Sequence, residues 1–220
     1  MNAKQTAARK AVEFVQDGMV VGLGTGSTAH WVIQRLGQRV KEGLRIRTIA
    51  TSLRSETLAR ELDIPVISFA DVTAIDLTID GADEVDPANR LVKGGGGSLL
   101  REKIVAAASR TFIVVVDESK VVAQLGAFPL PVEVVPFGWE VTARACAALG
   151  CTPTRRTTDG QPFVSDNGNF ILDCAFGTLA EPEALAVRLN AIPGVVENGL
   201  FLGMVDKLVI GRADGTCTLR

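Results

Sequence analysis

Short apolar runs that alternate with helix-like stretches constrain the first half of this chain most. The run 19–23 lies between two stretches, 4–16 and 28–40, in which apolar residues recur every three or four positions. That recurrence indicates amphipathic helices, and the apolar run between them indicates a buried strand. The alternation continues, with strands predicted at 46–50, 65–67, 75–79 and 111–116 and helices at 53–62 and 98–109. Strands alternating with helices predict crossover connections and a mostly parallel sheet.

The pattern changes after about residue 125. Prolines at 129, 131 and 136 indicate a connector that enters an extended segment. Helices are predicted at 139–149 and 183–190, separated by short strands with Asp-Gly and Asn-Gly turns. We therefore predict an α/β fold in two domains. The first has the mostly parallel sheet and comprises 1–127 plus 203–220, because the strand 207–211 rejoins that sheet and a hairpin follows it; the second, 128–202, is a smaller α+β domain.

Composition favours a soluble protein of the cytoplasm. The chain has 220 residues, of which 47% are hydrophobic, enough for a full core. Its 23 Lys+Arg against 25 Asp+Glu leave no basic surplus for nucleic acid. The N-terminus lacks a signal-peptide apolar region, and no apolar run is long enough to span a bilayer, so we expect no membrane association.

The cysteines do not form a metal-binding pattern. No two of the four are spaced as C-x-x-C, and the chain has a single histidine, His30. We therefore predict no metal, and expect small, partly buried thiols in a reducing compartment. The cysteines are Cys146, Cys151, Cys174 and Cys217.

The first candidate for chemistry is the glycine-rich loop 22–28, which follows a predicted strand and opens a helix. Free N–H groups and the positive dipole end of that helix suit a phosphate, to which Thr25, Ser27 and Thr28 add hydroxyl donors. A structural glycine turn with a hydroxyl cap is an equally good interpretation of these residues alone. A dinucleotide site would have an acidic residue after the next strand, and a Walker loop would have Gly-Lys-Ser/Thr; neither is present. A smaller phosphorylated ligand remains.

The second candidate is the acidic segment 80–86, just past the end of a predicted strand. Ligands bind at the carboxyl ends of strands in open α/β sheets. Asp80 and Asp83 lie nearest the strand and are the better functional candidates, whereas we expect Glu84 and Asp86 to be solvated. The spacing does not match an EF-hand loop, so a metal site is the minority interpretation.

The third candidate is the run of four glycines, 94–97, with Lys93 before it and a helix after it. A flexible linker is the structural alternative, but the run stands between apolar segments and directly begins a helix. It offers a second nest of N–H groups, and Glu102 lies in the first turns of the helix. A carboxylate, an ammonium group and amide donors together suit abstraction of a proton next to a carbonyl.

Three further residues have weaker signals. Lys120 follows another strand and could reach an anion at the same edge of the sheet. His30, beside the first glycine loop, is expected to cap or pack the helix start rather than to catalyse. Trp139 is expected to pack in the core.

Taken together and in this order, these loops resemble ribose-5-phosphate isomerase of the A type. The matching stretches cover nearly the whole chain. They are 24–28, 80–84, 93–97 with 101–103, 119–120, 128–134, 166–169 and 192–196.

The resemblance implies roles for particular residues. Glu102 would be the base that moves a proton between C1 and C2 of ribose 5-phosphate, Asp80 would assist ring opening with Asp83 nearby, and Lys93 would stabilise the enediolate. The loops would bind the substrate, with Lys4 as a further phosphate ligand. The substrate-binding set is Thr25, Gly26, Ser27, Thr28, Asp80, Gly81, Ala82, Asp83, Lys93, Gly94, Gly95, Gly96 and Lys120.

The resemblance also implies a Rossmann-like first domain, no cofactor and no metal, a place in the non-oxidative pentose phosphate pathway, and a homodimer or homotetramer. Two other classes stay open. One is a different enzyme on a related fold, such as a coenzyme A transferase or an amino-sugar-phosphate deaminase. The other is a non-catalytic sugar-phosphate sensor, which would usually have a helix-turn-helix and a basic face, and the chain shows neither.

Overall fold

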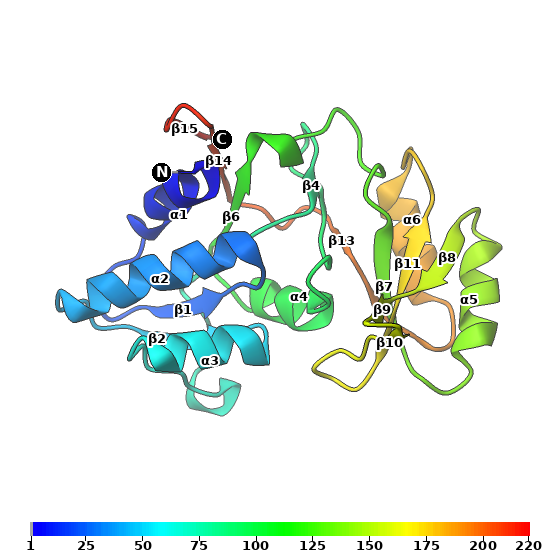
Figure 1. Cartoon of the computed structure of the whole chain (residues 1–220), viewed down its shortest axis with the longest axis horizontal. Helices are drawn as coiled ribbons and strands as arrows, with labels where there is room; N and C mark the ends of the chain where they lie inside the picture. Colours follow the sequence, from blue (N-terminus) through cyan, green and yellow to red (C-terminus); the bar gives the residue numbers. More distant parts are fainter. Residues whose placement is uncertain (1) are drawn as a thin grey trace. The chain divides into compact units, whose positions relative to one another are not determined.

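The chain consists of two compact units in the computed structural model, which describes residues 2–220 (Figure 1). Unit 1 is the chain up to Ala82 together with Arg101–Val121 and Met204–Arg220. Unit 2 is Asp83–Leu100 together with Val122–Gly203. Met1, the first residue of the predicted first domain, lies outside the described part.

Unit 1 is built on a six-stranded sheet, in the order β15-β14-β6-β3-β1-β2. Every pair is parallel except β14–β15, which is antiparallel. This confirms the mostly parallel sheet and the returning strand, which pairs with β6 and is followed by the expected hairpin. The strands are β1 (Val20–Leu23), β2 (Arg47–Ala50), β3 (Leu77–Asp80), β6 (Phe112–Asp117), β14 (Lys207–Gly211) and β15 (Cys217–Leu219).

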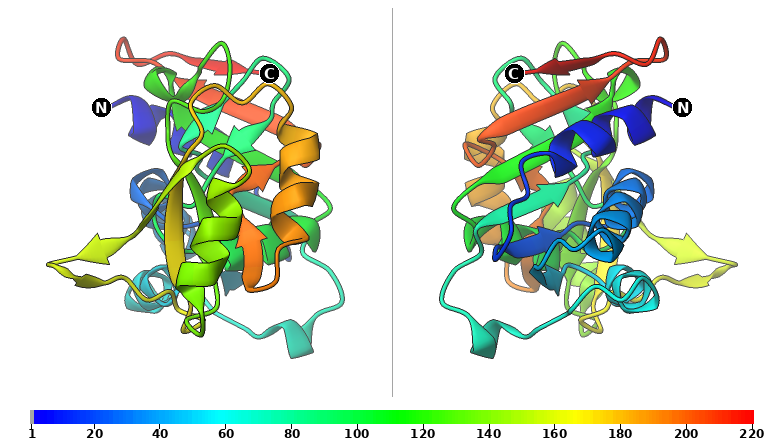
Figure 2. Two further views of the ribbon diagram at one scale, coloured as in Figure 1. Left: turned by 90° about the vertical axis from the view of Figure 1, so that its right-hand side faces the viewer. Right: turned by 90° about the vertical axis from the view of Figure 1, so that its left-hand side faces the viewer.

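Helices cover both faces of this sheet because the strand side chains alternate. Val21 and Leu23 of β1 share a buried cluster with residues of α1, α2 and α3, whereas Val20 packs with Val105 of α4. Burying each such aliphatic side chain contributes roughly 1.5–3 kcal/mol. Figure 2 shows α1 and α2 along one side of the strands. The helices are α1 (Ala3–Val12), α2 (Ser27–Lys41), α3 (Leu53–Glu61) and α4 (Leu99–Ala107), with 3₁₀ turns η1 (Phe69–Asp71) and η2 (Glu118–Lys120).

The strand predicted at 65–67 is reduced to a single bridge between Val66 and Thr48. Thr48 donates to the carbonyl of Pro65 at 2.8 Å and accepts from Ile67 at 2.9 Å. Ser68 then opens η1 with a capping box, so the extended segment ends at once.

The strand order places a topological switch point between β1 and β3. The chain leaves β1 through α2 toward β2 on one side, and β3 pairs on the other side. Loops that follow strands on the two sides of such a point form the usual ligand crevice of open α/β sheets. The loop after β1 is 24–26, and the strand β3 ends at Asp80.

Unit 2 is a smaller α+β body around a four-stranded antiparallel sheet, in the order β12-β7-β11-β8. Its core gathers residues of this sheet with α5 and α6, including Val132, Leu172 and Leu189. The main elements are β7 (Leu130–Val134), α5 (Trp139–Ala147), β8 (Thr152–Arg155), β11 (Phe170–Ala175), α6 (Pro182–Asn190) and β12 (Val195–Asn198). A small three-stranded sheet has the order β13-β5-β4, with β4 (Glu84–Val85), β5 (Leu91–Val92) and β13 (Leu200–Phe201). A separate pair is formed by β9 (Thr157–Thr158) and β10 (Gln161–Pro162).

The limits of the two units differ from the predicted domains at one segment above all. Residues 83–100 belong to unit 2, although the prediction assigned them to the first domain. The reason is a non-local pairing, in which Val92 of β5 lies opposite Leu200 of β13. The other limits lie at 121/122 and 203/204 rather than at 127/128 and 202/203.

No helix within residues 2–220 has both the length and the apolar character needed to cross a bilayer.

Candidate functional site

The first glycine-rich loop lies between β1 and α2 in unit 1. Gly26 occupies the N-cap position of α2 with φ of +101°, and no side chain caps the helix there. The first N–H groups of an α-helix have no partner within the helix and carry its positive dipole end. Among residues 2–220 the amides of Ser27 and Thr28 donate to no protein atom. The loop therefore has backbone N–H donors at the start of α2 without a protein acceptor in the described part of the chain.

Thr25 is the residue that fastens this loop. Its hydroxyl lies 2.8 Å from the hydroxyls of both Thr51 and Ser52, which follow β2, and Ser52 is the N-cap of α3. Its backbone N–H donates to Oδ1 of Asp80 at 3.0 Å. Both polar groups of Thr25 thus bind other parts of unit 1, which fixes the loop's path. The sequence did not indicate this hydroxyl cluster.

Asp80 is the last residue of β3 and is 1% exposed. Its Oδ1 also accepts from the amide of Gly81 at 2.7 Å, in addition to Thr25. These two amide donors hold the Asp80 carboxylate at the end of β3, at the switch point. Gly81 and Ala82 follow directly and complete this edge of unit 1.

Lys4 is the cation that touches the glycine-rich loop. Its Nζ donates to Oγ of Ser27 at 2.9 Å and lies 3.9 Å from a carboxylate oxygen of Asp117. A cavity of about 400 Å³ beside it is lined by residues of α1, of the β14–β15 turn and of the segment 117–119. Lys120 follows in η2, half-buried, and its ammonium contacts no acidic group among residues 2–220. Both predicted phosphate cations therefore belong to unit 1.

Glu102 lies in the first turn of α4 and is 4% exposed. Its place in the first turn of α4 sets the carboxylate near the positive end of the helix dipole. The predicted position near the start of the helix is confirmed, and the run of glycines ends two residues before α4 begins.

The remaining predicted residues belong to unit 2. Lys93 follows β5, is 2% exposed and places its Nζ 5.3 Å from the ring centre of Phe201. The amide of Gly97 donates to the carbonyl of Gly94 at 2.9 Å, which closes a turn over 94–97. The amide of Gly95 donates to Oδ2 of Asp83 at 2.7 Å. The four glycines therefore form an ordered turn, not a linker.

Glu84 and Asp86 are buried, which contradicts their predicted solvation. Glu84 is 3% exposed and accepts at 2.7 Å from the amides of both Gly126 and Phe128. Asp86 is 1% exposed and binds Arg90, whose pKa the hydrogen bond to Asp86 raises. Acidic segments usually face water. Here the amides of a distant segment bind Glu84, and the nearby Arg90 binds Asp86, so both carboxylates keep partners when buried.

The rings of His30 and Trp139, two of the weaker candidates, pack against other aromatic rings. His30 packs edge-on against Trp31, with ring centres 5.4 Å apart, in the first turn of α2. Trp139 packs against Phe170 at 6.5 Å in unit 2. No three metal-binding side chains gather into a metal site within the described chain.

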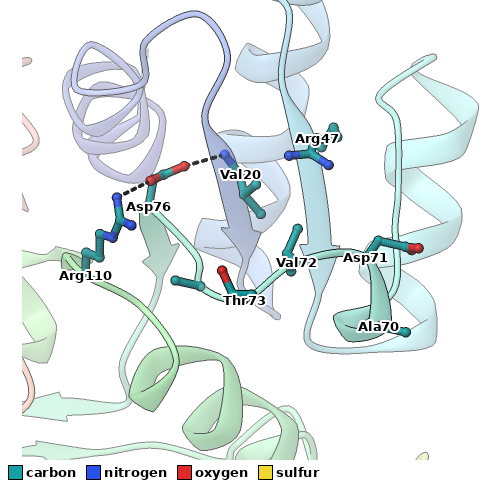
Figure 3. Close-up of a pocket in the computed structure, with 9 residues that line it drawn as sticks. Val20, Arg47, Ala70, Asp71, Val72, Thr73, Asp76 and Arg110 are labelled. Atoms are coloured by element: carbon teal, nitrogen blue, oxygen red, sulfur yellow. Dashed lines mark hydrogen bonds and ion pairs between the residues drawn. The ribbon is translucent and has the colours of Figure 1, made fainter.

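A second concavity of unit 1 lies at the opposite, amino-terminal ends of the strands. It has a volume of about 420 Å³. Figure 3 shows Asp76 between the amide of Val20, at 2.9 Å, and Arg110, at 3.1 Å. These contacts hold the start of β1 to the start of β3. The acidic and basic side chains that line the concavity balance one another, so its charge favours neither sign of ligand.

Comparison with known proteins identifies the family. The family model for ribose 5-phosphate isomerase A (phosphoriboisomerase A) matches residues 47–215. Ribose-5-phosphate isomerase A of Bacillus thuringiensis subsp. konkukian is 55% identical, with 98% of both chains covered. The protein of that name from Jannaschia sp. is 52% identical over 99% of this chain and 86% of its own.

Solved structures agree with the sequence comparisons. Ribose 5-phosphate isomerase A of Methanocaldococcus jannaschii superposes with a TM-score of 0.94 at 41% identity, covering 99% of this chain and 97% of the other. A D-ribose-5-phosphate isomerase in complex with phospho-erythronic acid gives 0.95 at 39% identity, covering 100% and 99%. By sequence and by fold, this chain belongs to the ribose 5-phosphate isomerase A family.

Proposed function

We propose that this protein is an aldose–ketose isomerase that interconverts D-ribose 5-phosphate and D-ribulose 5-phosphate through an enediolate. The observation that carries the proposal is the 55% identity over 98% of the chain to a ribose-5-phosphate isomerase A. The complex of a relative with phospho-erythronic acid, a four-carbon acid with a phosphate group, fits a sugar-phosphate substrate.

The phosphate would bind at the loop 25–28, with its amide donors at the start of α2. Lys4 supports this role, because its ammonium already contacts Ser27 of that loop. Lys120 would add a second positive charge. Charge-assisted hydrogen bonds of this kind are about twice as strong as neutral ones. Binding energy from the phosphate would thereby hold the pentose for chemistry at its other end.

Asp80 would assist ring opening, with Asp83 nearby. Opening the hemiacetal moves a proton from the hydroxyl on C1 to the ring oxygen and leaves a carbonyl at C1. A carboxylate at the switch point can relay that proton. The two amides that bind Oδ1 of Asp80 support this role, because they hold its carboxylate in one orientation.

Glu102 would then remove the proton from C2 of the open aldose and return it to C1. As the C2–H bond breaks, its electron pair forms the C1–C2 double bond and the carbonyl oxygen at C1 becomes an oxyanion. Lys93 and the amides of Gly94 to Gly96 would stabilise that oxygen. The hydroxyl proton on O2 passes to the oxyanion on C1, which becomes the C1 hydroxyl. The O2 oxygen then forms the C2 carbonyl as the C1–C2 double bond takes the proton back from Glu102 at C1, which completes the ketose.

We also propose that the protein works in the cytoplasm, without metal or nucleotide, as a homodimer or homotetramer. The resemblance to a metabolic enzyme family supports the location. Exposed apolar side chains in unit 2 support self-association, since Phe137 is 93% exposed and Val141 61%. Light scattering on the purified protein measures the oligomer directly.

The function is tested by adding ribose 5-phosphate in deuterated water, with EDTA and no nucleotide. The expected product is ribulose 5-phosphate with solvent deuterium at C1, because a proton held by a carboxylate exchanges with solvent. A ketose that has no deuterium would point to hydride transfer, and no ketose at all would reject the proposal. Glucosamine 6-phosphate and acyl-CoA serve as control substrates, since turnover of either would favour the other enzymes considered above.

A further inference from the structure

The glycine turn 94–97 of unit 2 is held from outside by one arginine. Nη1 of Arg156 donates to the carbonyl of Gly94 at 2.8 Å and to that of Gly95 at 3.2 Å. The other nitrogens of the same guanidinium bind Asp173, with Nε at 3.0 Å from Oδ2 and Nη2 at 2.5 Å from Oδ1. The planar guanidinium fork therefore has both of its sides occupied.

Arg156 and Asp173 both belong to the paired strands β8 and β11 or their direct continuation. Arg156 directly follows β8, and its own amide donates to the carbonyl of Ile171 at 2.8 Å, which continues the pairing with β11. Asp173 lies on β11, opposite Thr154 of β8. The Arg156 side chain is only 14% exposed, so its contact with Asp173 is shielded from solvent compared with an open surface pair.

An aromatic ring covers the next part of the turn. The guanidinium of Arg156 lies 5.8 Å from the ring centre of Phe163. Gly97 has φ of +79°, and a Cβ atom on it would come within 2.3 Å of the Phe163 ring. Only glycine fits there, so the turn lies directly against the segment that follows β8.

The geometry of a trans peptide decides what these contacts do. The C=O and N–H groups of one peptide unit point in opposite directions. The unit between residues 94 and 95 is held at both ends, because its oxygen accepts from Arg156 and its N–H donates to Asp83. The next unit is held only at its oxygen, again by Arg156. Its N–H, that of Gly96, therefore points away from Arg156, and it donates to no protein atom within residues 2–220.

We propose that Arg156, held by Asp173, is a positioning residue for the isomerisation that orients the Gly96 N–H toward the enediolate oxygen. This inference rests on the proposed function. Four glycines in a row are costly to order, and the contacts of Arg156 restrict them before substrate arrives. A cation on the carbonyl oxygen also polarises the peptide unit, which strengthens its N–H as a donor. Arg156 itself touches no reacting atom.

The experiment compares Arg156→Ala and Arg156→Lys with Arg155→Ala. Arg155 is the matched control, because it is the adjacent arginine and lies over Trp139 at 4.4 Å, away from the turn. For Arg156→Ala we expect kcat to fall about ten- to a hundredfold, the scale of a misplaced oxyanion donor, with KM changed less than about threefold. The kcat of Arg156→Lys should lie between those of the wild type and Arg156→Ala, because an ammonium group can bind one carbonyl but lacks the planar guanidinium fork. Arg155→Ala should keep the wild-type kcat.

Two further measurements separate positioning from a merely structural role. Guanidinium ion, added below the concentration that unfolds the protein, should raise kcat of Arg156→Ala and not that of Arg155→Ala. Phospho-erythronic acid has a planar, negatively charged carboxylate that resembles an enediolate, so it should bind Arg156→Ala more weakly by a factor similar to the loss in kcat.

The outcomes are distinct. An unchanged kcat in Arg156→Ala would overturn the inference, and so would a loss of kcat that follows a lowered unfolding midpoint and does not respond to guanidinium. A wild-type protein that does not isomerise ribose 5-phosphate would overturn the proposed function and this inference with it. If the wild-type protein isomerises ribose 5-phosphate and Arg156→Ala has the same kcat, the inference about Arg156 is wrong and the proposed function stands.

Discussion

Gly24 and Asp80 lie so close that a Cβ atom on residue 24 would stand 2.0 Å from Oδ1 of Asp80. Gly24→Ala must therefore displace the Asp80 carboxylate or the loop after β1. Because a shift of about 1 Å at a reacting group can cost a hundredfold in rate, we expect kcat to fall about a hundredfold. Steady-state isomerisation of ribose 5-phosphate measures this.

Gly37→Ala is the matched control for that substitution. Its new Cβ atom would come 2.9 Å from Cβ of Leu62, between α2 and α3, away from the loop after β1 and from Asp80. It should lower the unfolding temperature and leave kcat unchanged. If the two variants lose activity in equal measure, the effect at Gly24 is one of stability and not of the Asp80 position.

Lys4→Met should weaken binding of the phosphate. The variant removes the ammonium group that lies 2.9 Å from Oγ of Ser27. Hydrogen bonds to charged groups contribute about 1.5–3 kcal/mol, so KM for ribose 5-phosphate should rise about ten- to a hundredfold. Activity on unphosphorylated ribose should be unaffected, since no phosphate is there to bind. Lys10→Met, on the same helix but paired with Glu13 at 2.7 Å, should leave KM unchanged.

Glu84→Gln should lower the stability of the protein, and Glu84 has no proposed part in the reaction. The buried carboxylate accepts from two amides, and a glutamine has one acceptor oxygen, so one amide loses its partner. The expected cost is about 1–3 kcal/mol, seen as a lower unfolding temperature. Glu181→Gln, at an exposed position, should change the unfolding temperature little. A Glu84→Gln protein that unfolds at the wild-type temperature would contradict this account of the residue.

The cysteines should react slowly with thiol reagents in the native protein at neutral pH. Hydrogen bonding to Cys146 and Cys151, together with burial, raises the pKa of Cys174, and burial raises the pKa of Cys217. Thiols with raised pKa have little thiolate, which is the reactive form. The hydrogen bond with Cys174 lowers the pKa of Cys146 and Cys151, so for these two thiols it is their burial that keeps reagents away. Cys217 is the more exposed and should react first, while the three thiols of unit 2 should react only on unfolding. Cys217→Ser should remove the early phase, and rapid reaction of more than one thiol would refute the expectation.

The sequence predicted the local features of this fold well. The apolar run of β1, the glycines after it and the acid at the end of β3 have their signals within a few neighbouring residues. The parallel sheet and the returning strand follow from that alternation. The helix start near Glu102 was likewise visible, because the glycines mark where it begins.

What the sequence did not show depends on distant partners. Residues 83–100 join unit 2 through the pairing of Val92 with Leu200, more than a hundred positions away. Glu84 is buried only because the amides of Gly126 and Phe128 bind it. Arg156 has no motif of its own, since its role depends on two carbonyls from a turn that sequence patterns do not place beside it.

The central claim is that Glu102 is the base, and Glu102→Gln tests it most directly. The glutamine keeps the size of the side chain but cannot accept the C2 proton. We predict that kcat falls about 10²- to 10⁴-fold, while ribose 5-phosphate still binds with near-normal affinity by calorimetry. Glu140→Gln, also in the first turn of a helix but exposed, should retain full activity. Near-normal turnover by Glu102→Gln would contradict the account.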